Sequence, residues 1–146
     1  MKFLIIHGPN LNLLGLREPD IYGTMTYSSL CSFIAEVCEA EGVEADFFQS
    51  NHEGSLIDAI HAAYHSADAI IINPGAYAHT SIAILDALKS VALPAIEVHL
   101  TDIQNREPFR QHSYTALACR EMICGQGAEG YRQAVQNLKQ YLINRQ

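Results

Sequence analysis

The feature that most constrains this chain is the regular alternation of short apolar segments with helical patterns. Five short segments have the pattern of strands and lie at residues 3–6, 43–48, 69–72, 95–100 and 121–124. The segment at 69–72 is apolar at every position, which is typical of a central parallel strand covered on both faces. Strands that alternate with helices predict an α/β fold built on one five-stranded parallel sheet.

Apolar residues recur at helical spacing between these segments. The first helix is expected over residues 26–41, because Gly42 is a stop signal after it. The second is expected to begin at a capping box that starts with Ser55. Either Thr80 or Ser81 is expected to cap the third helix, and right-handed crossovers would place the helices against the sheet. The last helix carries apolar residues at Tyr131, Val135, Leu138 and Leu142.

Length and composition limit the class of protein. The 146 residues predict a single domain over 1–146 with room for a sizeable core. A net charge of −7 argues against binding to nucleic acid or to an anionic membrane surface. No apolar run has membrane-spanning length, and the first apolar segment is too short for a signal peptide. The four cysteines form no C-x-x-C pair, so we expect a cytoplasmic protein with reduced thiols, in which Cys31 and Cys38 face the core.

Polar residues gather just after the predicted strands, where ligands bind in an open parallel sheet. The candidates are Asn10, Arg17 and Tyr22 after the first strand, Asn73 and His79 after the third, and Glu97, His99, Thr101, Arg106 and Arg110 in and after the fourth. Because the carboxyl ends of parallel strands meet at one edge, these side chains are expected to form a site for a polyhydroxylated acid.

Glu97 and His99 lie two residues apart on a predicted strand, so their side chains share one face. A carboxylate beside an imidazole fixes its tautomer and stabilises the protonated ring, which suits a general acid. The same pair can also have a purely structural role. The two residues alone leave both interpretations open.

Tyr22 lies in a loop that also contains Arg17. A tyrosine with an ordinary pKa is scarcely ionised at neutral pH, but a nearby guanidinium favours the phenolate. Tyr22 is then a candidate base. Taken alone, a loop tyrosine more often packs or forms a surface hydrogen bond, and that alternative stays open at this point.

Cofactor and metal sites are not predicted. The segment 7–15 contains glycines but lacks both phosphate-loop patterns. His61 and His65 are four residues apart, with no third ligand nearby. The chain's lysines, Lys2, Lys89 and Lys139, lie outside the candidate loops, which argues against a Schiff-base route.

Five linked motifs resemble the type II dehydroquinases, in order and nearly from end to end. They are residues 8–15 with 17–19 and 22–23, residues 49–54, residues 73–76 with 79–81, residues 97–100 with 106–110, and Gly127-x-x-Gly-Tyr131. The resemblance implies a flavodoxin-like, doubly wound sheet in three α/β/α layers. It also implies a cofactor-independent hydro-lyase that converts 3-dehydroquinate to 3-dehydroshikimate by anti elimination through an enolate, in the shikimate pathway or in quinate breakdown.

The resemblance also implies roles for individual residues. Tyr22 would remove the proton next to the ketone, Arg17 would activate Tyr22, and Asn10 would hold a water that stabilises the enolate oxygen. His99 would protonate the departing hydroxyl, and Glu97 would orient it. Substrate-binding roles fall on Asn73, His79, Leu100, Thr101 and Arg110, and on Asp86, which would reach a neighbouring subunit's site in a homododecamer built from trimers.

One expectation concerns the substrate carboxylate. The Thr101 N–H is expected at a helix start, where it would receive that carboxylate. Thr101 and Asp102 stand where the family more often has Ser and Asn, so the hydroxyl is kept and a negative charge is added. Two other functions are retained as alternatives: a flavodoxin-like binding or signalling module, and a metal-dependent hydrolase.

Overall fold

A central parallel sheet organises the computed structural model, which describes residues 1–16, 18–22 and 24–146, and only the backbone of Pro19 and Tyr22. Its strands in the described residues are β1 Lys2–His7, β2 Glu44–Gln49, β3 Ala69–Asn73, β4 Ala95–His99 and β5 Glu121–Cys124. They are all parallel and lie in the order β2-β1-β3-β4-β5. The predicted five-stranded parallel sheet is confirmed.

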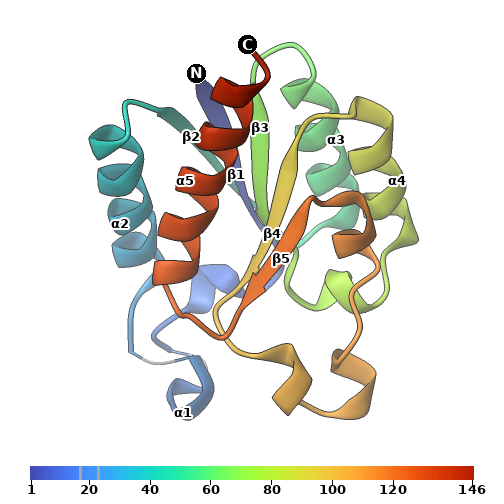
Figure 1. Ribbon diagram of the computed structural model, residues 1–146. Coiled ribbons are helices and arrows are strands. Elements are labelled where there is room, and N and C mark those ends of the chain that lie inside the picture. Colours follow the sequence, from blue (N-terminus) through green and yellow to red (C-terminus); the bar gives the residue numbers. More distant parts are fainter. Residues whose placement is uncertain (17, 23) are drawn as a thin grey trace.

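Helices cover both faces of this sheet (Figure 1). One face carries α2 Tyr27–Ala40 and α5 Glu129–Asn144, and the other carries α3 Glu53–Ala63 and α4 Ile82–Val91. Side chains of β3 alternate between the two layers: Ile71 packs with α2 and α5, whereas Ile70 and Ile72 pack with α3 and α4. All five β3 residues are buried, which explains the continuous apolar run in the sequence. The three-layer, doubly wound fold is therefore as predicted.

The chain changes direction across the sheet at β1. It runs from β1 outward to β2 and then returns to β3 on the other side of β1. This switch point lies between β1 and β3, where ligands of open α/β sheets bind. The carboxyl ends of the strands point away from the two termini and carry short helical turns (Figure 1). These are η1 Leu11–Leu13, α1 Pro19–Tyr22, η2 Gly75–His79, η3 Ile103–Asn105 and η4 Pro108–Arg110. A further turn, η5 Thr115–Ala118, precedes β5 and packs against α4.

Two glycines allow the loops after β1 and β3 to pass very close to each other. The Gly8 N–H donates to the Asn73 carbonyl at 2.8 Å. A Cβ atom on Gly8 would lie 2.3 Å from the Pro74 carbonyl oxygen. Gly75 has a φ of +59°, which favours glycine. This close approach holds the loops after β1 and β3 side by side at the carboxyl edge of the sheet.

The helix boundaries correct one prediction and decide another. The capping box expected at Ser55 is wrong: α3 begins at Glu53, and its N-cap His52 makes no side-chain cap hydrogen bond. The turn before it is set by Ser50, whose Oγ accepts from the His52 N–H at 2.9 Å. For α4, Ser81 rather than Thr80 is the cap, since its Oγ accepts from the Ile84 N–H.

The structure also tests the expected burial of the cysteines and the expected absence of a membrane-spanning segment. Cys38 is buried as predicted, Cys31 is only partly buried, and all four cysteines are free. None of the helices in the described residues is long and apolar enough to cross a membrane.

Candidate functional site

A cleft lies beyond the carboxyl ends of β1, β3 and β4. The space between its walls, counted together with the solvent at its open mouth, amounts to about 560 Å³. Its lining consists of Pro9, Asn10, Leu11, Asn73, Gly75, Ala76, His79, His99, Leu100, Thr101, Ile103, Arg106 and Arg110. Eight of the residues expected from the sequence or from the family resemblance are therefore brought together here: Asn10, Asn73, His79, His99, Leu100, Thr101, Arg106 and Arg110.

The pair formed by Glu97 and His99 lies at the end of β4. The His99 Nε2 atom is 2.5 Å from Glu97 Oε1, so the predicted pairing is confirmed. Glu97 is fully buried, whereas His99 reaches the cleft wall. Because Nε2 is held by Glu97, Nδ1 is the ring nitrogen that remains for a ligand. A carboxylate in this position fixes the tautomer and the orientation of the ring, so the pair can serve as a general acid.

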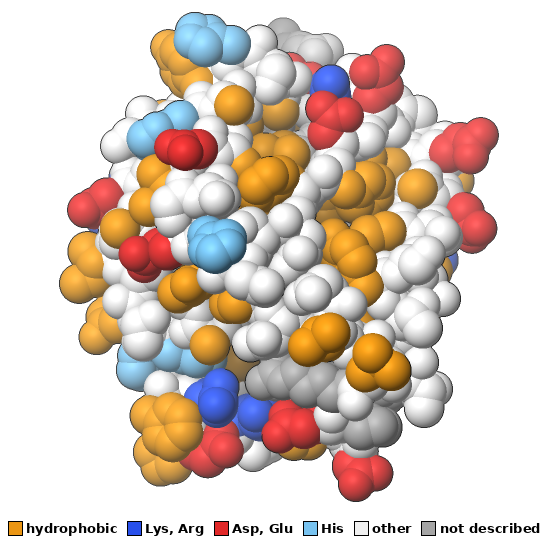
Figure 2. Space-filling model, turned by 180° about the vertical axis from the view of Figure 1, so that it is seen from behind, with side chains coloured by type: hydrophobic (Ala, Val, Ile, Leu, Met, Phe, Trp, Pro, Cys, Tyr) orange, Lys and Arg blue, Asp and Glu red, His pale blue; other side chains and the backbone are white. Residues whose placement is uncertain are grey.

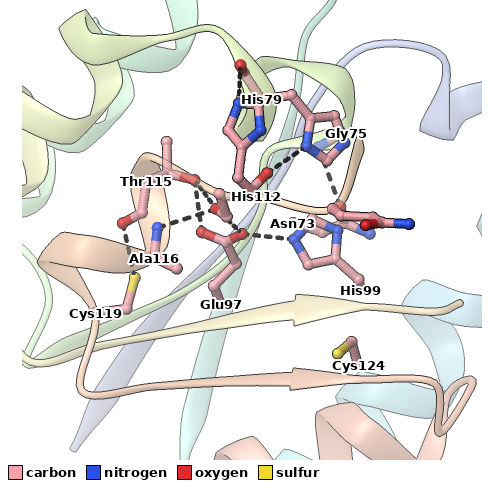
Figure 3. Close-up of polar contacts among 12 residues, drawn as sticks. Asn73, Gly75, His79, Glu97, His99, His112, Thr115, Ala116, Cys119 and Cys124 are labelled. Atoms are coloured by element: carbon pink, nitrogen blue, oxygen red, sulfur yellow. Dashed lines mark hydrogen bonds and ion pairs between the residues drawn. The ribbon is translucent and has the colours of Figure 1, made fainter. Parts of the chain in front are cut away.

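Two hydroxyl groups behind Glu97 were not predicted from the sequence. Ser113 Oγ donates to Glu97 Oε1 at 2.6 Å, and Thr115 Oγ1 donates to Oε2 at 2.5 Å (Figure 3). They follow Glu97 by 16 and 18 residues, in a segment with no helical or strand periodicity. Local periodicity could therefore not have shown that the two hydroxyls share a partner.

His79 faces His99 across the cleft. Its Nδ1–H donates to the His112 carbonyl at 2.7 Å, and His112 Nε2 donates back to the His79 carbonyl at 2.9 Å. Burial lowers the pKa of His79 below its usual value; the His112 carbonyl opposes this effect, and the nearby His99 and Arg110 add to it. A neutral His79 has Nε2 free to accept a hydrogen bond. Its ring stacks on that of His99 with 6.4 Å between the ring centroids.

Amide side chains complete the wall near the switch point. Asn73 Oδ1 accepts from the Gly75 N–H at 3.1 Å, and its side chain also forms a hydrogen bond with Tyr131, so the orientation of the amide is fixed. Asn10 has a left-handed φ of 68°, and its N–H donates to Asn51 Oδ1 at 3.0 Å. Gln49 Nε2 donates to the Gly8 carbonyl at 3.2 Å. The motif at residues 49–54 thus supports the β1 loop and does not line the cleft.

Two arginines make one end of the cleft basic despite the negative net charge. Arg106 and Arg110 both line it. Arg110 Nε lies 3.0 Å from Glu107 Oε2, so the two side chains form an ion pair. Figure 2 shows basic side chains beside acidic ones at the edge of the molecule beyond the strand ends. Guanidinium groups in this position suit an acidic, hydroxylated ligand.

A family model described as "Dehydroquinase class II" matches residues 1–139. The chain belongs to the class II dehydroquinase family. The resemblance seen in the sequence is therefore confirmed, and so is the expectation that the chain is an enzyme of this family.

Individual relatives support this family assignment over most of the chain. A 3-dehydroquinate dehydratase of Actinobacillus pleuropneumoniae is 52% identical over 92% of this chain and 87% of that protein. Another from Clostridium acetobutylicum is 50% identical over 97% of this chain and 99% of that one. The crystal structure of the type II dehydroquinase from Butyrivibrio crossotus superposes with a TM-score of 0.93 at 49% identity, covering 95% of this chain and 97% of that chain.

The expected helix start at Thr101 is wrong in this dehydroquinase. The short helix η3 begins at Ile103, with Asp102 as its N-cap. The Asp102 carboxylate accepts from the Gln104 N–H at 3.0 Å and from Asn105 Nδ2 at 3.1 Å. Thr101 lines the cleft, but it lies two residues before the helix. The Asp102 charge is engaged by its own turn and does not belong to the cleft lining.

Four predicted residues are not among the residues that line the cleft, and one of them is Glu97, which is buried behind His99. Asp86 is exposed on α4, outside the lining residues. Arg17 lies outside the described residues, as does the side chain of Tyr22. No group of three or more His, Cys, Asp or Glu side chains is arranged to hold a metal ion in the part of the chain that the structure describes.

Proposed function

We propose that this class II dehydroquinase is a hydro-lyase that removes water from 3-dehydroquinate to give 3-dehydroshikimate. The observation that carries the proposal is the imidazole of His99, backed by the buried Glu97 carboxylate, at the wall of a polar cleft beyond the strand ends. Both relatives named above, at 50% identity or more, are 3-dehydroquinate dehydratases.

The cleft offers complementary groups for a hydroxylated ring acid. Arg110 supplies a guanidinium for ring hydroxyls, and the Asn73 amide and His79 Nε2 supply a donor and an acceptor. Leu100 and Thr101 form the wall next to His99. We assign these five residues to substrate binding. Asp86 is assigned to the site of a neighbouring subunit.

The reaction needs a base, stabilisation of negative charge on the ketone oxygen, and an acid at the leaving group. Tyr22, activated by Arg17, takes the proton from the carbon next to the ketone, and the C–H electron pair forms the enolate. A water held by Asn10 stabilises the enolate oxygen. The enolate then collapses, the C–O bond breaks, and His99 gives its proton to the departing hydroxyl. Base and acid act on opposite faces, so the elimination is anti.

Formation of a conjugated enone provides the assay. We expect purified protein to convert 3-dehydroquinate into a product with enone absorbance, and to do so equally well in the presence of a chelator. Activity that disappears with the chelator would support a metal-dependent enzyme. Binding of 3-dehydroquinate without product would support a binding module.

The role of Tyr22 is tested by Tyr22→Phe, which removes only the phenolic oxygen. Because the base is lost and the ring is kept, turnover should fall below detection while substrate affinity stays close to that of the wild type. Calorimetric titration and the enone assay measure the two quantities. Full turnover in this variant would remove Tyr22 as the base.

The cellular setting follows from the same proposal. We place the enzyme in the cytoplasm, as one domain over residues 1–146 that acts in the shikimate pathway for aromatic amino acids. We propose a homododecamer built from trimers. Sedimentation of the purified protein tests this assembly, and a fully active monomer would contradict it.

A further inference from the structure

The carboxylate of Glu97 has hydrogen bonds with two hydroxyl groups in addition to its hydrogen bond with His99. Oε1 lies 2.5 Å from His99 Nε2 and 2.6 Å from Ser113 Oγ, and Oε2 lies 2.5 Å from Thr115 Oγ1. Glu97 and Thr115 both have zero exposed surface. Water therefore cannot replace a donor that is lost from this group.

We propose that Thr115 is a positioning residue that acts through Glu97 on the proton-donating form of His99, with Ser113 as its helper. The proposal rests on the proposed function, since it gives these hydroxyls a part in delivering the proton to the leaving group. Neither hydroxyl group belongs to the cleft lining, so neither is a catalytic residue.

The two hydroxyl groups differ in what the Glu97 carboxylate loses when each is removed. Among the described residues, Oε2 has a hydrogen bond from Thr115 alone, whereas Oε1 has both His99 and Ser113. Ser113 Oγ also accepts from the Ala116 N–H at 3.1 Å, so it holds the turn that begins η5. Ser113 therefore shares its hydroxyl with the backbone. Loss of Thr115 Oγ1 leaves a buried oxygen with no donor in the described residues.

That loss should reach His99 through the carboxylate. Without the Thr115 hydroxyl, the Glu97 carboxylate is free to turn about its last bond, which loosens the hydrogen bond that fixes the orientation and tautomer of the His99 ring. A ring that is held less firmly delivers its proton to the leaving group less efficiently.

The test compares Thr115→Val, which keeps the shape and removes the hydroxyl, with Thr115→Ser, which keeps the hydroxyl. Thr115→Val should lower kcat about tenfold or more with KM little changed, because a buried acceptor loses its donor. Thr115→Ser should retain most of kcat. Ile34→Val, on the buried face of α2, is the control for a small change in core packing and should leave kcat unchanged.

A second measurement does not depend on turnover. The ¹⁵N signals of His99 report its tautomer and charge, and they should change in Thr115→Val but not in Thr115→Ser or Ile34→Val. If Thr115→Val does not fold, Ser113→Ala removes a donor from Oε1 and should change the same signals. Unchanged kcat together with unchanged His99 signals in a folded Thr115→Val would overturn the proposal. A wild-type protein inactive on 3-dehydroquinate would instead refute the proposed function, while the ¹⁵N comparison would still decide the role of Thr115.

Discussion

His7, at the end of β1, is the most unusual titratable residue away from the cleft. It has no exposed surface and lies between two tyrosines: Nδ1 is 3.1 Å from Tyr27 Oη and Nε2 is 3.0 Å from Tyr131 Oη. Burial lowers the pKa of His7 from 6.5 to about 3. The folded protein thus holds a neutral ring that ties β1 to α2 and α5. The cluster explains the choice of Tyr131 in the last helix, where a smaller apolar residue would also fit the periodicity.

The depressed pKa of His7 predicts a dependence of stability on pH. The unfolded chain binds a proton at this residue between pH 6.5 and about 3, and the folded chain does not. The contribution of His7 to the free energy of unfolding is therefore fully present above pH 6.5. It is lost as the pH falls toward about 3, with a slope of up to about 1.4 kcal/mol per pH unit. In His7→Gln that part of the slope should disappear.

Urea unfolding of wild type and His7→Gln across this pH window measures the difference in slope. His61→Gln is the matched control, since His61 is exposed on α3. The control should follow the wild-type slope. Equal slopes for His7→Gln and wild type would show that His7 does not carry the effect.

At the scale of elements, the loops after β1 and β3 depend on the absence of a side chain at Gly8. A Cβ atom there would lie 2.3 Å from the Pro74 carbonyl oxygen, and backbone cannot move aside as a flexible side chain does. Gly8→Ala should therefore destabilise the fold by about 1–3 kcal/mol through overpacking. It should also reduce turnover, because the displaced loops carry Asn10 and Asn73.

Gly54→Ala provides the control for this prediction. Gly54 lies in α3, and a Cβ atom there would meet nothing within 4 Å. Alanine should stabilise the helix by about 0.5–1 kcal/mol. Urea unfolding of both variants gives the comparison, and a Gly8→Ala protein as stable as Gly54→Ala would contradict the packing argument.

The elements also show how far the sequence predicts this fold. Strand periodicity and the buried run at 69–72 were enough for the sheet, because a parallel strand covered on both faces has a strong apolar signal. The start of α3 was missed because it depends on a hydrogen bond from His52 to Ser50, which leaves no periodic pattern. The turn at Asp102 was missed for a similar reason, since η3 is too short to have a period.

The site was predictable where residues are neighbours in sequence and less so where the fold brings them together. Glu97 and His99 share a strand face, so their pairing follows from a spacing of two. Ser113 and Thr115 reach Glu97 only because η5 folds back against β4, which contacts it closely. A tertiary contact of this kind has no signature in local periodicity.

At the scale of the whole molecule, net charge and local charge give different information. The charge of −7 argues against polyanionic partners, yet Arg106 and Arg110 make one end of the cleft basic. A small acid is thus attracted locally by a protein that repels nucleic acid overall. The fold supplies this combination by collecting the loops after three strands at one edge of the sheet.

The central claim is that this edge delivers a proton from His99 to the leaving hydroxyl of 3-dehydroquinate. The most direct measurement is the rate of enone formation by His99→Ala, taken together with the affinity of that variant for substrate. The account predicts a rate lower by about 10²–10⁴-fold, as expected for a lost general acid, with affinity changed little. His61→Ala, on the exposed side of α3, should keep the wild-type rate. A wild-type rate in His99→Ala would contradict the claim.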